Sequence, residues 1–106
     1  MIKHVVMWKV SGDTPDARRA TREKVKQQFE GLRSLIPGLL ALEVGLDVSG
    51  VDYACDVVLY TEFDSPQALA AYADHPEHLR VRRELDGLRV ARFQVDYFPA
   101  EASSHA

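Results

Sequence analysis

Hydrophobic residues recur along this chain at two spacings, and each spacing predicts a different element. Alternation at every second position is typical of strands that bury one face, whereas recurrence at every third or fourth position is typical of amphipathic helices. Residues 2–10, 40–48, 53–63 and 89–98 follow the strand pattern. Residues 14–36 and 65–85 follow the helical pattern. The chain is therefore predicted to mix α and β structure.

Both helical segments begin with a hydroxyl residue followed by proline. Thr14 and Ser65 stand at the N-cap position, where a side-chain oxygen accepts a hydrogen bond from the first turn, and the following proline suits the first helical position. The apolar spacing carries the first helix to Ile36, and Pro37 and Gly38 are predicted to end it.

The second helical segment contains a proline that should divide it. Pro76 cannot continue the preceding helix and disfavours helical geometry at His75, so a kink is expected there. A further helical piece is predicted from Pro76 to about Leu85. On that piece His78 shares a face with Leu85 and should point inward, whereas His75 lies in the kink and can point elsewhere.

The predicted order is strand, helix, strand, strand, helix, strand, which is the ferredoxin-like βαββαβ unit of the α+β class. Residues 53–63 are apolar at most positions of both faces, which favours a central strand. A chain of 106 residues has room for one domain. We assign it to residues 1–99 and expect residues 100–106 to form a flexible tail.

Helices on one side of the sheet would leave its other side uncovered. That open side is predicted to be apolar, either at Leu40, Leu42 and Val44 or at Phe93 and Val95. Because exposed apolar faces of this size usually mark interfaces, we predict a symmetric homodimer in which two sheets pack together.

Composition narrows the range of partners. Thirteen basic residues are outnumbered by 16 acidic ones for a net charge of -3, which argues against nucleic acid. The N-terminal stretch is too short and too charged for a signal peptide or a membrane span. Cys55 lacks a second cysteine to pair with, which favours a reducing compartment or a buried, inert thiol. We therefore expect a cytoplasmic protein that contacts no membrane.

The densest candidate chemistry is the segment from Tyr72 to His78, which holds a phenol, a carboxylate and two imidazoles around Pro76. Histidine titrates near physiological pH and tyrosine can donate or accept a hydrogen bond, so these residues could form an acid–base cluster. The alternative interpretation is a pair of surface histidines that flank a helix start. Likewise His4, on the apolar face of the first strand, is either a satisfied core histidine or a functional one.

The chain resembles the stress-responsive α/β-barrel (Dabb) family, whose members form dimeric α+β barrels. Several short motifs, taken in their order along the chain, carry this resemblance. The resemblance runs nearly end to end. Its motifs are Met1 to Val6, Ile36-Pro37-Gly38, Val44-Gly45, Tyr60 to Ser65, Ala71-Tyr72, His75 to His78, and Val95-Asp96-Tyr97.

A plant polyketide cyclase of this kind closes rings without metal or organic cofactor, and the resemblance implies matching positions here. His4, Tyr72 and His78 match its functional positions, and Asp96 matches an acidic residue that can hold the catalytic imidazole. His78 would act as general base, Tyr72 would donate to an enolate oxygen, and Asp96 would orient the ring. The predicted substrate-contacting residues are Val6, Trp8, Val25, Phe29 and His75. Trp8 is bulkier than that enzyme's pattern, which argues against a long-chain substrate.

Two functions remain open at this point. One is a cofactor-independent cyclase, lyase or isomerase acting on a small, apolar carbonyl compound. The other is a non-enzymatic stress-response or binding protein whose histidines are structural. A metal site is a lesser alternative, because His75 and His78 would need further ligands from Asp74, Glu77 or His4. No cofactor or metal is predicted.

Overall fold

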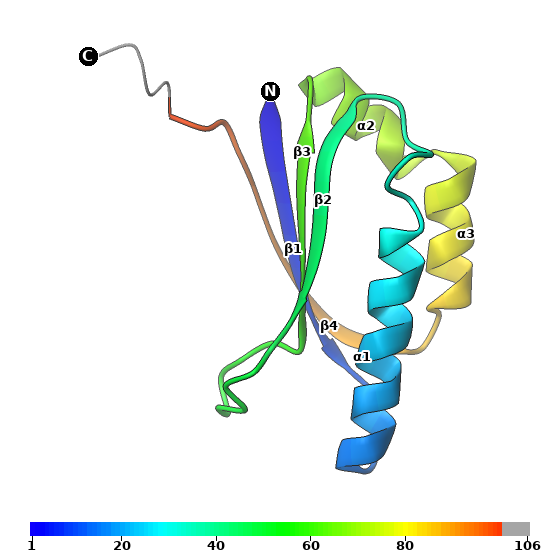
Figure 1. Ribbon diagram of the computed structural model, residues 1–106, viewed down its shortest axis with the longest axis vertical. Coiled ribbons are helices and arrows are strands. Elements are labelled where there is room, and N and C mark those ends of the chain that lie inside the picture. The colour runs from blue at the N-terminus through cyan, green and yellow to red at the C-terminus, as the bar shows by residue number, and fades with distance from the viewer. Residues whose placement is uncertain (101–106) are drawn as a thin grey trace.

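The computed structural model describes residues 1–100, and these form a four-stranded antiparallel sheet with all helices on one face (Figure 1). Its elements are β1 (Ile2–Val10), α1 (Pro15–Glu30), β2 (Leu39–Leu46), β3 (Val57–Phe63), α2 (Pro66–Ala73), α3 (Pro76–Glu84) and β4 (Arg89–Tyr97). The strand order β2-β3-β1-β4 confirms the ferredoxin-like βαββαβ prediction, with β3 central. The predicted tail falls outside the described residues, apart from Ala100.

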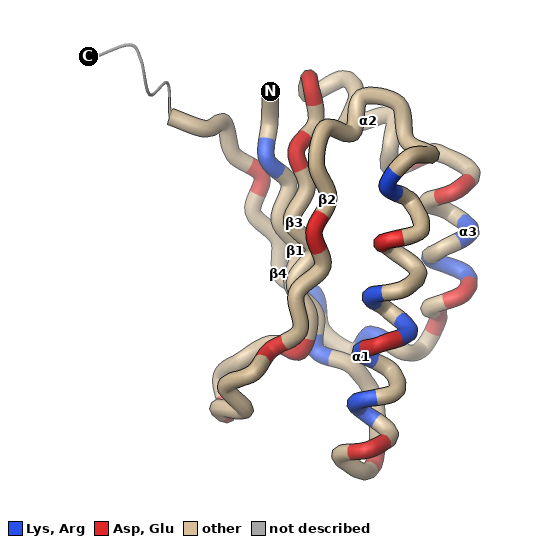
Figure 2. Tube along the Cα trace, in the orientation of Figure 1, with Lys and Arg blue, Asp and Glu red and all other residues tan. Residues whose placement is uncertain are grey.

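The core lies between the sheet and the helices, as the alternation predicts. Side chains at every second position of β1 and β3 are buried against an apolar stripe of α1 and the segment that follows it. The fully or almost fully buried members include Val6, Val25, Phe29, Leu32, Val57, Leu59, Phe63 and Val81. Charged residues gather on α1 and α3 (Figure 2). Within residues 1–100, no helix combines the length and hydrophobicity needed to cross a bilayer.

The helix starts follow the predicted caps, but α1 ends earlier than predicted. The Thr14 and Ser65 hydroxyls accept hydrogen bonds from the amides of the first turns of α1 and α2. The helix stops at Glu30 instead of Ile36, because Gly31, a poor helix former, occupies its C-cap. The chain then continues in tight turns with i to i+3 bonds, which keep Leu32 and Ile36 buried.

Strand β2 shows which of the two predicted apolar faces of the sheet is the open one. A bulge at Leu40 shifts the pairing with β3, and this side chain is 57% exposed. Leu42 and Val44 point toward the helices and are buried. The open face is instead the one that carries Phe93 and Val95, which are 51% and 57% exposed.

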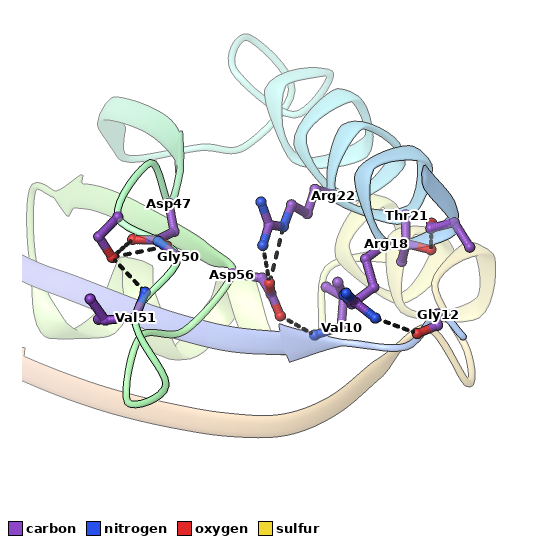
Figure 3. Close-up of polar contacts among 11 residues, drawn as sticks. Val10, Gly12, Arg18, Thr21, Arg22, Asp47, Gly50, Val51 and Asp56 are labelled. Carbon is purple, nitrogen blue, oxygen red and sulfur yellow. Dashed lines mark hydrogen bonds and ion pairs between the residues drawn. The ribbon is translucent and has the colours of Figure 1, made fainter. Parts of the chain in front are cut away.

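Asp56, in the loop before β3, joins three parts of the fold (Figure 3). One carboxylate oxygen accepts hydrogen bonds from the Arg22 side chain on α1, at 2.5 and 3.0 Å. The other accepts the Val10 amide at 2.9 Å, where β1 ends. The Asp56 amide donates to the Trp8 carbonyl oxygen at 2.8 Å.

Replacing Asp56 by alanine is expected to lower the free energy of unfolding by about 2 kcal/mol, because a partly buried charged acceptor and its bonds are lost together. For a domain of this size that corresponds to a melting temperature roughly 10 °C lower. Arg19→Ala is the control, since it removes an ion pair with Asp16 whose side chains are 71% and 88% exposed. Thermal denaturation followed by circular dichroism checks both variants. If Asp56→Ala melted at the same temperature as Arg19→Ala, the result would contradict the assigned role of Asp56.

Candidate active site

A cavity of about 520 Å³ lies between the sheet and the helices, near the break between α2 and α3. It combines apolar walls with imidazole, phenol and guanidinium groups. Its lining residues are His4, Val6, Trp8, Phe29, Leu59, Tyr72, Ala73, His78, Arg82, Arg89, Val90, Ala91 and Arg92. Six elements, β1, α1, β3, α2, α3 and β4, thus contribute to one chamber.

His4 lies on the helix-facing side of β1, directly opposite Asp96 on β4. Its Nδ1 is 2.5 Å from Asp96 Oδ1, and the side chain is almost fully buried. Because an ionised carboxylate only accepts hydrogen bonds, Nδ1 is the donor in this contact, and in the neutral ring Nε2 then keeps a free lone pair. The Thr61 hydroxyl donates to the His4 carbonyl oxygen at 2.7 Å. The imidazole that Asp96 holds is therefore that of His4, and the expectation that it would orient His78 is wrong.

Tyr72, near the end of α2, is buried against Phe63 and His78, with ring centroids 5.2 and 4.3 Å away. Burial raises the pKa of its phenol well above the usual value. Every fully buried polar side-chain atom in residues 1–100 has a hydrogen-bond partner. The Tyr72 hydroxyl has none there, so it opens onto the cavity as a protonated donor.

His78, in the first turn of α3, presents the second imidazole. Its Nδ1 donates to the Ala73 carbonyl oxygen at 3.0 Å, which leaves Nε2 unprotonated in the neutral ring. Burial lowers the pKa of His78, and the nearby charges of Arg82 and Arg89 lower it further against the opposing effect of the Ala73 bond. The ring is therefore neutral at pH 7.

Two predicted substrate contacts lie elsewhere. His75 is the N-cap of α3, where its Nδ1 accepts the Glu77 amide at 3.1 Å, and it does not line the cavity. Val25 is completely buried in the core beneath α1 and does not reach the cavity either. Val6, Trp8 and Phe29 do line it, with the Trp8 and Phe29 rings stacked at 4.9 Å.

Three arginines of the cavity were missed as site residues. Arg82 comes from α3, and Arg89 and Arg92 come from β4. A bulge at Val90 is the reason for the position of Arg89: simple alternation puts this residue on the open face with Ala91, but the shifted register pairs it with Val10 on the helix side. One sequence signal could have revealed polar site residues on β4. Arg92, Gln94 and Asp96 recur at every second position, on a face that should otherwise pack against the core.

The metal alternative lacks a ligand set in the described part of the chain. Residues 1–100 contain no group of three or more His, Cys, Asp or Glu side chains placed to hold an ion. His75 and His78 instead bond to backbone groups.

Comparison with known proteins identifies the family. The family described as "Stress responsive A/B Barrel Domain" matches residues 2–99. The chain belongs to this family. A stress-response A/B barrel domain-containing protein of Arabidopsis thaliana is 28% identical over 96% of the chain. The match covers 49% of that relative, so this A/B barrel chain spans about half of its length.

Solved structures share the fold. A dimeric ferredoxin-like protein of unknown function from Bacteroides fragilis is 31% identical, with a TM-score of 0.79, covering 91% of this chain and 93% of its own. The hydroxynitrile lyase of Passiflora edulis has a TM-score of 0.77 at 12% identity, covering 95% and 94%. This second likeness shows the fold of the A/B barrel chain alone.

Proposed function

We propose that this A/B barrel protein is a cofactor-independent enzyme that performs acid–base chemistry on a small carbonyl compound in the cavity. The observation that carries the proposal is the convergence of His4, Tyr72 and His78, from three separate elements, on one chamber with apolar walls. The Asp96 carboxylate behind His4 supports it, because a general base needs a fixed ring and tautomer.

In this mechanism His4 Nε2 removes a proton from carbon next to a carbonyl group, and Asp96 stabilises the resulting imidazolium. Tyr72 donates a hydrogen bond to the oxygen on which the negative charge develops. Neutral His78, beside the Tyr72 ring, accepts a hydrogen bond from substrate or carries a second proton. Ring closure, cleavage or isomerisation can each follow from the same enolate, and the proton then returns from His4.

Proton exchange tests the proposal without knowledge of the final product. Small 1,3-dicarbonyl compounds and keto acids are incubated with the protein in D₂O, and loss of the acidic C–H signal is followed by NMR. We expect faster exchange than in buffer for compounds that shift the His4 and Tyr72 resonances. A compound that binds at these residues and exchanges no faster than in buffer would contradict the proposed chemistry.

The non-enzymatic alternative rests on a specific observation: His75 and His78 both fix backbone groups around the break between α2 and α3. If that is the whole role of His78, a His78→Ala variant will melt at a lower temperature and bind the same compounds unchanged. The enzymatic proposal requires that the variant also lose exchange activity.

We also propose that the chain forms a homodimer through the open face of its sheet. Four exposed apolar side chains lie on that face, namely Met7, Phe93, Val95 and Tyr97. The Bacteroides fragilis relative is dimeric. A second copy packed on the same face by two-fold symmetry would cover these side chains.

Phe93→Asp is expected to abolish this dimer, because it places a charge at the centre of the apolar face. Light scattering after size exclusion should give the mass of one chain, 11.9 kDa, for the variant and twice that for the wild type. Leu35→Asp is the matched control, since Leu35 is 45% exposed on the connection after α1, away from the open face. A wild-type chain of single mass would overturn the proposal.

A further inference from the structure

We propose that the compound bound in the cavity carries a carboxylate, and that Arg82, Arg89 and Arg92 bind it. This inference rests on the proposed function, because it assigns a substrate class to the same chamber. All three side chains line the cavity together with His4, Tyr72 and His78. An anion held by them would lie beside the proton-transfer groups.

None of the three cavity arginines has an acidic partner among residues 1–100. Arg19, Arg22 and Arg80 each lie within 3 Å of a carboxylate oxygen. Among residues 1–100, no ion pair and no side-chain hydrogen bond involves the cavity arginines. Their N–H groups are therefore available to a ligand, and the paired donors of guanidinium match carboxylate geometry.

Arg89 is held in place without such a partner. Its guanidinium carbon lies 5.0 Å from the Trp8 ring centroid and 5.8 Å from that of Phe29, so two aromatic faces support the charge. Burial, followed by the charges of Arg82 and Arg92, lowers the pKa of this guanidinium. A bound anion would offset both effects, which favours an anionic ligand over a neutral one.

The position of the charges also suits the chemistry. The positive charges of Arg82 and Arg89 lower the pKa of His78, and those of Arg89 and Arg92 lower the pKa of Tyr72 against the larger effect of burial. The cationic cluster therefore lies close to both groups. A carboxylate bound there would place a carbonyl a bond or two away near the Tyr72 hydroxyl. A short keto acid fits this arrangement, whereas the sequence predicted a small, apolar carbonyl compound.

Binding of acetoacetate and of its neutral methyl ester, measured by isothermal titration calorimetry, tests the inference. We expect the wild type to bind the acid about tenfold more tightly than the ester, the effect of one charge-assisted bidentate contact. Arg89→Gln and Arg82→Gln should each remove most of this preference. Arg80→Gln is the control. Arg80 lies on α3 like Arg82, but it pairs with Glu77 and does not line the cavity.

Several outcomes would overturn the inference: equal affinity for acid and ester, an unchanged preference in both variants, or inorganic phosphate that competes as well as acetoacetate. Arg82 is exposed, so its variant keeps the test valid if Arg89→Gln fails to fold. Binding is measured without turnover. A lost preference therefore counts against the carboxylate site, whereas absent proton exchange counts against the proposed enzyme.

Discussion

Replacing His4 by glutamine should slow proton exchange by about 10²–10⁴-fold, the usual contribution of a positioned general base. Glutamine keeps a polar side chain of similar reach opposite Asp96, but it cannot accept a proton at neutral pH. The binding of acetoacetate should change little, because the cavity arginines remain. Rates from the NMR exchange assay and affinities from calorimetry measure the two effects separately.

Asp96→Asn is the companion variant. An asparagine amide can donate to His4 Nδ1 and so favour the tautomer whose proton sits on Nε2, where it blocks the base. The Asp96 side chain is 33% exposed, so the replacement should disturb the fold little. We expect a loss of exchange smaller than that of His4→Gln. Full activity in His4→Gln would show that His4 is not the general base. His78 would then be the remaining candidate for that role.

Replacing Tyr72 by phenylalanine should lower the exchange rate by about 10²–10³-fold, the cost of losing one donor to a developing oxyanion. The phenol makes no hydrogen bond within residues 1–100, so the fold loses no polar contact and the melting temperature should stay close to that of the wild type. An activity loss that comes with a large drop in melting temperature would point instead to a packing role.

The pH profile adds a second check on Tyr72. Burial raises the pKa of this phenol, so the donor stays protonated beyond the pH at which an ordinary tyrosine ionises. Activity should therefore not fall near pH 10 through loss of this proton. On the acidic side, the lowered pKa of His78 keeps that ring neutral to a lower pH than an unperturbed histidine. An alkaline limb that disappears in Tyr72→Phe would contradict this account.

The alternation of apolar residues was enough to predict the fold, because the buried faces of β1 and β3 and the stripe on α1 are continuous in sequence. Local irregularities were not predictable in the same way. The bulge at Leu40 depends on how the chain packs after the elements form. The end of α1 at Glu30 was missed because the apolar spacing continues past the C-cap Gly31 to Ile36. Apolar residues on one face of β2 could not show whether that face met helices or solvent.

The site was partly predictable for a similar reason. His4, Tyr72 and His78 stand out by residue type, and their elements bring them to one cavity. The partner of Asp96 depends on the register of β4 against β1, which places it opposite His4, and no local pattern states that register. Arg89 was missed because a single extra residue, Val90, reverses the face on which it lies.

Strand β4 connects two surfaces of the molecule through one backbone. Arg92 and Asp96 point to the helix side, and Phe93 and Val95, their neighbours in sequence, point to the open face. A second copy on the open face would hold this edge strand in position, and with it the carboxylate behind His4. The activity per chain would then depend on protein concentration, falling on dilution as subunits separate and β4 gains freedom.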